Sequence, residues 1–468
     1  MLTWILALGA AQGGGLELPA LFSDHLVLQR ETRAPLWGRA EPGAPVELRA
    51  SWDEHALLVT AGADGRWRAE LATPAAGGPY ELTLTSGGET RVLHDILVGE
   101  VWLAAGQSNM EWTLGPGVWD GAEGWEEAVR AADDPALRFF AVENALAPAP
   151  LDDVRARWIA SDQESARSFS ACAYFFAQKL RRELGVPVGV MTADWGGTPA
   201  EAWTRATALH PFAEFWESLA RLEELAERAE PSAGLRPSDP SVLWNAMIAP
   251  LVPAAIRGVI WYQGEANCSA AAQYLRLFPA LITDWRAAFA QPEMPFLFVQ
   301  IAPFEYPDDH GAAAALRDAQ RRTLALPNTG MAVTMDIGDP HDIHPKKKRE
   351  VGERLALWAL ARTYGRALEC AGPLVRSMTR AGSALQLEFE HGEGLTSRGE
   401  PVRHVTIAGE DGVFHPAEAR IAGASLVVSS PAVAAPLYVR FGSGAADETN
   451  LWNAAGLPAA SFRTDDWP

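Results

Sequence analysis

Hydrophobic and polar residues follow two kinds of pattern along this 468-residue chain. From residue 16 to about 95, short apolar runs alternate with polar positions and are separated by turns, such as Glu-Pro-Gly at 41–43. Regularly spaced short strands with turn signals are typical of a β-sandwich. The same pattern returns after residue 369, for example at 385–389. We therefore predict two small all-β domains, one at residues 15–95 and one at 369–468.

Between these flanks, longer apolar runs alternate with helix-like stretches rich in Ala, Leu and Arg. Strands that are buried on both faces give continuous apolar runs, and strands alternating with helices predict a parallel, doubly wound sheet. We expect this α/β domain to span residues 96–368, and we assign no structure to its segments 114–165 and 205–245. The expected strands are Ile96–Ala105, Val188–Ala193, Ile256–Tyr262, Phe296–Ile301 and Met331–Asp336, and the expected helices are Cys172–Leu184, Tyr274–Ala290 and Ala312–Ala325.

Net charge and the N-terminal residues narrow the possible partners and location. The net charge of −20 argues against a nucleic-acid or anionic-membrane partner, because phosphates would be repelled. Residues 1–14 form a short apolar run followed by small residues, as in a secretory signal, although no Lys or Arg precedes the run. No apolar run is long enough to span a bilayer. The sequence therefore predicts a secreted or periplasmic protein without a membrane span.

The three cysteines, Cys172, Cys268 and Cys370, lie far apart in the chain. Their odd number and wide spacing exclude a disulfide framework and a zinc knuckle. Buried free thiols are favoured over one bridge with one thiol left over.

Polar residues follow the ends of the expected strands, where ligands bind in a doubly wound sheet. Ser108 follows the first strand two residues after Gly106, which suits an exposed nucleophile, although a helix N-cap is the favoured interpretation of this serine taken alone. Gly196 and Gly197 follow the second strand and allow backbone N–H groups to approach a ligand closely. Asn267 follows the third strand, and its side-chain amide can donate a hydrogen bond to a developing oxyanion.

His344 lies in the segment that follows the fifth expected strand. Pro345 fits the first position of a helix, and Val351, Leu355 and Trp358 then mark an apolar helix face. His344 is therefore expected in a loop at the edge of the sheet. A neutral His with a nearby carboxylate is the arrangement that a serine hydrolase needs.

Three alternatives remain open on this evidence. Two His and three Asp within residues 336–344 can also hold a metal ion. Glu265 with a second carboxylate would suit glycoside hydrolysis. The chain could instead be a non-catalytic carbohydrate-binding protein, although the combination of Ser108 and His344 speaks against that.

The basic run Lys346–Arg349 stands at the expected start of a helix, where cations oppose the helix dipole. It is interpreted either as a solvated surface or as a local attraction for an anionic substrate beside His344.

In chain order, the four strand ends supply serine, glycine, amide and histidine. In this the sequence resembles the SGNH hydrolase superfamily, and more closely the sialate O-acetylesterase family. The resemblance covers nearly the whole chain after the first 14 residues, and it implies an SGNH hydrolase domain between the two β domains. The motifs that carry it are Gly106–Glu111, Trp195–Thr198, Glu201–Trp203, Trp261–Asn267, Asp342–Pro345 and Asn450–Ala459.

The resemblance implies a serine esterase that removes acetyl groups from sugars and needs no metal or cofactor. Ser108 would be the nucleophile, His344 its base and Asp342 the acid that orients His344, while Asp339 and Asp336 compete for the last role. The oxyanion donors would be the backbone N–H of Ser108, that of Gly197 (or Gly196) and the side chain of Asn267, and the substrate-binding residues would be Gln107, Gln263 and Glu265.

The expected substrates are O-acetylated sialic acids. Acetylxylan or pectin-type acetyl esters are the alternative. A neutral acetylated sugar such as xylan fits the net charge of −20 better, because this charge repels the carboxylate of a sialic acid at long range. Some of the tryptophans near the motifs can be sugar-stacking platforms, namely Trp112, Trp119, Trp195 and Trp203.

Overall fold

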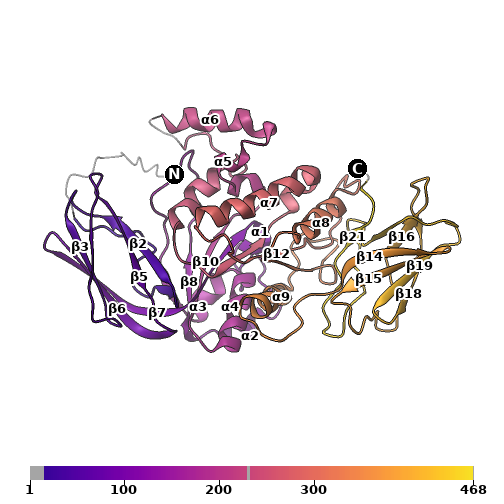
Figure 1. Ribbon diagram of the computed structural model, residues 1–468, viewed down its shortest axis with the longest axis horizontal. Coiled ribbons are helices and arrows are strands. Elements are labelled where there is room, and N and C mark those ends of the chain that lie inside the picture. The colour runs from indigo at the N-terminus through magenta and orange to yellow at the C-terminus, as the bar shows by residue number, and fades with distance from the viewer. Residues whose placement is uncertain (1–14, 229–231, 467–468) are drawn as a thin grey trace.

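The computed structural model describes residues 15–228 and 232–466, so the expected signal segment lies outside the described residues. Three parts follow one another along the long axis of the molecule (Figure 1). A β region in indigo and violet lies at one end, an α/β region from magenta to orange occupies the middle, and a yellow β region lies at the other end.

The middle region is built on one sheet with the strand order β13-β12-β11-β7-β10-β8-β9. All neighbouring pairs from β13 to β8 are parallel, and β9 runs antiparallel to β8. The predicted parallel sheet is therefore confirmed. The strands are β7 (Glu89–Gly106), β8 (Asp134–Ala141), β9 (Trp158–Ser161), β10 (Val188–Asp194), β11 (Gly258–Tyr262), β12 (Phe296–Val299) and β13 (Thr329–Ala332).

Helices cover both faces of this sheet. On one face, Trp261 of β11 packs against Phe278 of α7, with the ring centroids 6.3 Å apart. On the other face, Trp102 of β7 packs edge-on against Phe176 of α4 at 5.0 Å. Successive strand residues thus enter two separate apolar cores, which confirms the doubly wound architecture. The helices are α1 (Ser108–Glu111), α2 (Trp125–Arg130), α3 (Gln163–Ser168), α4 (Ala171–Leu184), α5 (Ala206–Leu209), α6 (Trp216–Ala226), α7 (Ala271–Ala288), α8 (Ala312–Thr323) and α9 (Lys348–Trp358).

The 18-residue strand β7 connects the N-terminal β region to the central sheet. Its first half pairs antiparallel with β6, and its second half lies between β10 and β11. The domain boundary expected at residue 95 falls inside this strand. The N-terminal strands are β1 (Val27–Gln29), β2 (Arg33–Arg39), β3 (Pro45–Ala50), β4 (Leu57–Thr60), β5 (Arg66–Ala72) and β6 (Gly77–Ser86).

A buried carboxylate stabilises the point where the two regions join. Glu100 of β7 has no exposed surface. It accepts hydrogen bonds from Arg30 Nε at 2.5 Å and from Arg257 Nε at 2.8 Å. Gln29 Nε2 adds a third at 3.1 Å. Because a buried charge is tolerated only when it is paired, these contacts fix the N-terminal region against the central sheet.

The C-terminal region consists of two four-stranded sheets, with the orders β14-β15-β19-β18 and β17-β16-β20-β21. The predicted return to β structure after residue 369 is confirmed. The strands are β14 (Leu374–Ala381), β15 (Ala384–Glu390), β16 (Val405–Ala408), β17 (His415–Pro416), β18 (Glu418–Ala422), β19 (Ser425–Ser429), β20 (Tyr438–Phe441) and β21 (Phe462–Arg463).

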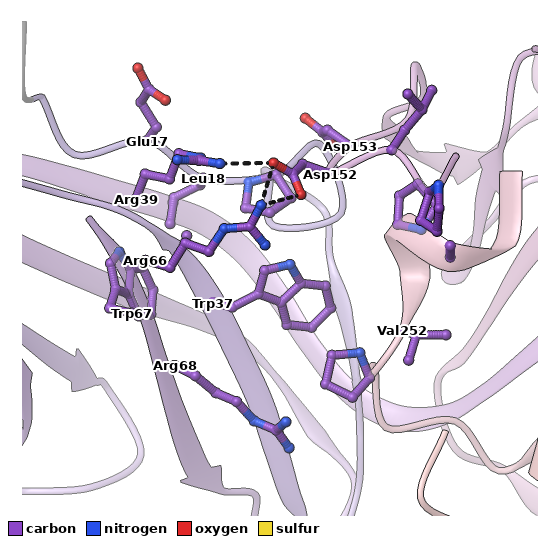
Figure 2. A pocket seen from close by; sticks show the side chains of 17 residues that line it. Glu17, Leu18, Trp37, Arg39, Arg66, Trp67, Arg68, Asp152, Asp153 and Val252 are labelled. Carbon is purple, nitrogen blue, oxygen red and sulfur yellow. Dashed lines mark hydrogen bonds and ion pairs between the residues drawn. The ribbon is translucent and has the colours of Figure 1, made fainter. Parts of the chain in front are cut away.

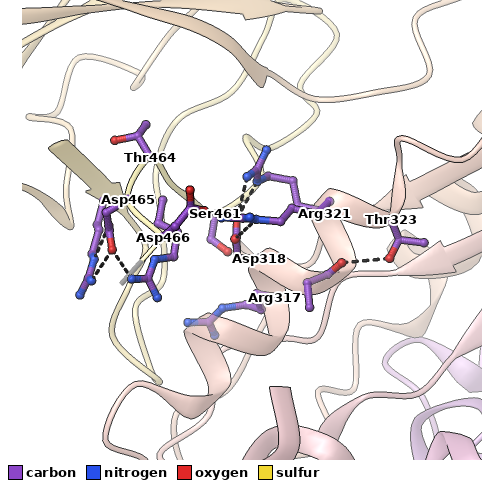
Figure 3. A network of polar contacts seen from close by, with 12 residues as sticks. Arg317, Asp318, Arg321, Thr323, Ser461, Thr464, Asp465 and Asp466 are labelled. Atoms are coloured by element: carbon purple, nitrogen blue, oxygen red, sulfur yellow. Dashed lines mark hydrogen bonds and ion pairs between the residues drawn. The ribbon is translucent and has the colours of Figure 1, made fainter. Parts of the chain in front are cut away.

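Helix α8 holds the C-terminal region in place (Figure 3). The fully buried Arg317 donates hydrogen bonds to the carbonyl oxygens of Gly442, Gly444 and Ala445 at 3.2, 2.7 and 3.1 Å. Arg322 of the same helix donates to Asp466 at 2.6 Å. Arg317 thus satisfies backbone carbonyl groups of a loop more than a hundred residues away in sequence, and Arg322 pairs with a carboxylate beyond that loop.

The fifth strand differs from the prediction, which placed it at Met331–Asp336. It ends at Ala332, because the hydroxyl of Thr334 donates to the carbonyl oxygen of Gln300 and the chain turns there. The apolar run continues past the strand because Met335 is buried against the C-terminal region, where its carbonyl accepts from the N–H of Thr449.

Strand β8 lies in the segment 114–165, for which the sequence predicted no structure. Its apolar run is interrupted by Arg138, which is 2% exposed. The guanidinium pairs with Asp95 at 2.8 Å, and its Nε donates to the carbonyl oxygen of Pro135. A charged side chain is tolerated inside this buried strand because these partners compensate it. The hydrophobic pattern of the strand itself does not reveal them.

Two further findings complete the fold. Cys172, Cys268 and Cys370 are free and buried, as predicted. Within the described residues, no helix has both the length and the apolar character needed to cross a membrane.

Replacing Glu100 with Ala should lower the free energy of unfolding by about 3 kcal/mol, because it leaves Arg257 and Arg30 without their buried counter-charge. Urea unfolding measures this directly. The matched control is Glu31→Ala, since Glu31 is exposed and faces the same Arg30 at 3.7 Å; its loss should stay below about 0.5 kcal/mol. Equal losses for both variants would contradict the role given to Glu100.

Candidate active site

Ser108 is the first residue of α1, immediately beyond the end of β7. The strand reaches this point through Gly106, whose φ is +147°. A Cβ atom on Gly106 would lie 2.1 Å from the carbonyl oxygen of Tyr262 on β11, so only glycine fits. The close approach of β7 and β11 thus sets the position of the serine at the edge of the sheet.

The imidazole of His344 contacts this serine directly. Nε2 of His344 lies 2.8 Å from Oγ of Ser108, across 236 residues of sequence. The imidazole packs against the rings of Trp119 and Trp112, with centroid distances of 4.8 and 5.4 Å. Burial, and secondly the positive charge of Lys348, lower the pKa of His344, while Asp342 opposes this. The neutral form that can accept a proton is therefore favoured.

The three aspartates considered as partners of His344 have different surroundings. Oδ1 of Asp342 lies 3.6 Å from Nδ1 of His344 and accepts the backbone N–H of His344 at 2.9 Å. Asp339 accepts the backbone N–H of His341. Asp336 forms a bidentate ion pair with Arg354 at 2.7 and 2.8 Å. Asp342 is therefore the candidate whose carboxylate lies beside the ring, although 3.6 Å is longer than a hydrogen bond.

Two backbone N–H groups are available near Ser108. Within the part of the chain that the structure describes, the N–H groups of Ser108 and Gly197 have no hydrogen-bond acceptor. The N–H of Gly196, the alternative to Gly197, is already donated to Oε2 of Glu111 at 2.7 Å. This leaves Gly197, with a φ of +73°, as the free donor of the glycine pair.

Asn267 is oriented by a set of buried side chains. Its Oδ1 accepts from Nε2 of Gln263 at 2.6 Å, and its Nδ2 donates one hydrogen bond to Glu201 at 2.9 Å. One N–H of the amide remains for another acceptor. Gln263 itself has no exposed surface, so in this structure it positions Asn267. A direct contact between Gln263 and substrate stays a prediction.

The buried amide of Asn109 joins three loops of the site. Its Nδ2 donates to Oε1 of Glu265 at 2.6 Å and to the carbonyl oxygen of Ile343 at 3.1 Å, next to His344. Gln107 adds a parallel link, since its Oε1 accepts the N–H groups of Gly264 and Ala266 at 3.3 and 3.2 Å. The substrate contacts predicted for Gln107 and Glu265 also stay predictions.

Lys348 is a residue of the site that the sequence analysis misinterpreted. It is fully buried, and its Nζ donates to Oδ1 of Asn109. The ammonium group lies 5.2 Å from the ring centre of Trp112 and 5.6 Å from that of Tyr262. Burial lowers its pKa to about 8. Helix α9 starts at Lys348 and not at Pro345. The lysine therefore lies in the first turn of the helix, and its side chain lies beneath the site.

The remainder of the basic run also differs from what was expected. Lys346 pairs with Asp120 at 2.9 Å, and the guanidinium of Arg349 lies over the ring of Phe175 at 4.4 Å. The run is therefore neither a fully solvated surface nor a row of free cations beside His344.

Two carboxylates near Ser108 received no role from the sequence. Burial raises the pKa of Glu111, whose carboxylate accepts from Gly196. Burial and the nearby charge of Glu111 raise the pKa of Asp194 to about 8. The position of Glu111, three residues after Ser108 on one helical turn, was the available signal, because such a spacing places both on the same side.

Of the four tryptophans proposed as sugar platforms, two are unsuitable by burial. Trp203 is completely buried and donates its Nε1–H to Thr198, and Trp112 is 3% exposed. Trp119 and Trp195 are partly exposed. Trp119 stacks on Trp112 at 4.9 Å and forms the outer part of the aromatic wall beside His344.

The described residues offer no cluster of ligands for the metal alternative. Among them, no three His, Cys, Asp or Glu side chains are grouped so that they could hold a metal ion. His341 points to Glu305 at 3.5 Å, while His344 points to Ser108.

The sequence and the fold both match known carbohydrate esterases. The family model described as carbohydrate esterase, sialic acid-specific acetylesterase, matches residues 98–361. The chain is 32% identical to the human sialate O-acetylesterase over 412 residues, which cover 80% of this chain and 76% of the human protein. Identity to the rat sialate O-acetylesterase is also 32%, over 435 residues, with 81% and 79% covered.

Among solved structures, a carbohydrate acetylesterase from Xanthomonas citri superposes with a TM-score of 0.88 at 40% identity, covering 97% of this chain and 100% of that one. The chain belongs to the sialate O-acetylesterase family and is a carbohydrate acetylesterase.

Proposed function

We propose that Ser108 is the nucleophile and His344 the general base in the hydrolysis of sugar acetyl esters. The 2.8 Å contact between Oγ and Nε2 carries the proposal. Nε2 accepts the hydroxyl proton as Oγ attacks the acetyl carbonyl carbon, and the proton then passes to the departing sugar oxygen. Water attacks the acetyl-enzyme in the same way and releases acetate.

The oxyanion of each tetrahedral intermediate is stabilised by the N–H groups of Ser108 and Gly197 and by the free N–H of Asn267. Such preorganised donors contribute roughly 10²–10³ each to the rate. Glu111 supports this arrangement, because its bond to Gly196 fixes the turn that presents Gly197.

Asp342 stabilises the imidazolium of His344 when the proton has been taken up. Its hydrogen bond to the backbone N–H of His344 keeps the carboxylate close to the ring. A small rotation brings Oδ1 from 3.6 Å into hydrogen-bond distance of Nδ1. Asp336 and Asp339 are held in other contacts and serve the loop.

The substrate is an O-acetylated glycan without a carboxylate next to the ester. Lys348 is buried, Lys346 is paired with Asp120, and Arg349 lies over Phe175. Little of the basic run is therefore free for an anionic sugar, and the net charge of −20 disfavours one at long range. The relatives named sialate O-acetylesterase favour the alternative, an O-acetylated sialic acid.

The partly exposed Trp119 offers an apolar surface beside His344 on which a sugar ring can stack.

We also propose that the protein acts outside the cytoplasm, where a polymeric glycan substrate is accessible. This proposal is based on the signal-like pattern of residues 1–14.

Replacing Lys348 with Met should lower kcat about 10-fold to 100-fold, since Asn109 loses a contact that holds His344 against Ser108. The rise of kcat/KM with pH should also move to higher pH, because removing a positive charge raises the pKa of His344. A pH–rate profile measures both effects. The exposed neighbour provides the control, Lys347→Met, which should leave the profile unchanged. A profile of Lys348→Met identical to wild type would refute this role.

The proposed function is tested by measuring acetate release from acetylated xylan, acetylated pectin and O-acetylated sialosides, with Ser108→Ala as the inactive control. We expect the neutral substrate, acetylated xylan, to give a higher kcat/KM than pectin and the sialosides, which both carry carboxylates. Dialysis against EDTA should cause no loss of activity. A preference of tenfold or more for sialosides would overturn the neutral substrate. Activity retained by Ser108→Ala would overturn the mechanism.

A further inference from the structure

A cavity of about 630 Å³ lies between the N-terminal β region and loops of the central region (Figure 2). None of the residues that line it belongs to the active site. Ligand sites commonly have this size and occur between domains. We propose that this cavity binds an uncharged stretch of the polysaccharide whose acetyl group is removed at Ser108, an inference that rests on the proposed function.

The outer face of the β2–β5 pair forms one wall. Trp37 lies opposite Arg68 in the strand register, and Arg39 lies opposite Arg66. The intervening residues, such as Leu36, are buried on the other face, so these four side chains all face outward. The ring of Trp37 packs edge-on against Phe22 at 4.7 Å, which holds it in a fixed orientation.

The loop of residues 150–153 forms part of the facing wall. Asp152 accepts hydrogen bonds from Arg39 at 2.8 Å and from Arg66 at 2.7 Å, as Figure 2 shows. Asp153 accepts the N–H of Ala20 at 2.9 Å. Prolines and Val252 complete the wall beyond the indole of Trp37. These contacts preorganise the two walls relative to each other.

The chemistry of the lining suits a neutral sugar. Three arginines, Arg39, Arg66 and Arg68, are balanced by three acids, Glu17, Asp152 and Asp153. Guanidinium and carboxylate groups bind hydroxyl groups, and a partly exposed indole stacks on the apolar face of a sugar ring. The ion-pair partner of Arg68 within the strand, Glu70, is 3.9 Å away, so the guanidinium can donate to a ligand.

The connection between β8 and β9 brings the cavity close to the active site. The side chain of Asn144 hydrogen-bonds Glu111, next to Ser108, and Pro150 of the same connection lines the cavity. The two residues are six positions apart in the chain, so their backbones lie at most about 22 Å apart. This distance is within the reach of one extended polysaccharide.

Binding of soluble xylan, acetylated and deacetylated, to the full chain carrying Ser108→Ala tests the proposal by calorimetry. Adding Trp37→Ala or Arg68→Gln should weaken binding threefold to tenfold. In the active enzyme the same changes should raise KM for the polymer, with kcat and the rate on p-nitrophenyl acetate unchanged. The control is Trp216→Ala, an exposed tryptophan on α6, which should bind as the parent does.

Parent-like binding by both cavity variants would overturn the proposal, as would an equal effect of Trp216→Ala. If Trp37→Ala loses p-nitrophenyl acetate hydrolysis and Arg68→Gln keeps it, the Trp37 variant has a folding defect. The binding of xylan by Arg68→Gln, which changes an exposed side chain, then decides whether the cavity proposal holds. If the wild-type enzyme hydrolyses only sialosides, the proposed neutral substrate is wrong. Xylan binding that depends on Trp37 would in that case still support the cavity as a polysaccharide-binding site. Absence of xylan binding by Ser108→Ala would overturn the cavity proposal.

Discussion

The hydrogen bonds of the Asn109 amide are the contact on which the rest of the site depends. Asn109 donates to Glu265 and to the carbonyl of Ile343, and it accepts from Lys348. It follows Ser108 directly, so Ser108, the loop after β11 and the histidine loop are fixed to one buried side chain. The proposed mechanism requires the reacting atoms of Ser108 and His344 to stay within hydrogen-bond distance, and this amide supplies that constraint.

The groups around this amide are charged, buried and mutually dependent. Lys348 lies beneath the site with its pKa lowered to about 8, and burial raises the pKa of Glu265. Placing such groups away from water costs stability unless partners compensate. Lys348 has two effects on the site. Together with burial, its charge lowers the pKa of His344, and its hydrogen bond holds Asn109. The same arrangement removes Lys348 from any direct contact with substrate.

Much of the fold could be predicted, because buried strands and amphipathic helices have strong local patterns. The runs at β7, β10 and β11 and the residues Ser108, Gly197, Asn267 and His344 after the strand ends were found in this way. Because parallel strands bring their carboxyl ends to one edge, separate sequence signals could be combined into one site. The resemblance to a known family then linked those residues to acetyl-ester chemistry.

The remaining features depend on contacts between distant parts of the chain. Arg138 interrupts the apolar run of β8, so the hydrophobicity pattern does not predict this strand. The partner that makes the buried arginine possible, Asp95, lies 43 residues away in sequence. Met335 extends an apolar run past β13 because the C-terminal region covers it. Both interpretations of the basic run expect an exposed Lys348, because a lysine within such a run is ordinarily exposed, and only the position of Asn109 shows why it is buried.

The central claim is that His344 activates Ser108 as the nucleophile, and covalent labelling with a fluorophosphonate tests it most directly. After labelling of the intact protein, peptide mass spectrometry identifies the modified residue, and the rate is measured across pH. The account predicts a single adduct on Ser108, formed faster as His344 loses its proton and greatly slowed in His344→Ala. An adduct on a different serine, or labelling of Ser108 at an unchanged rate without the histidine, would contradict it.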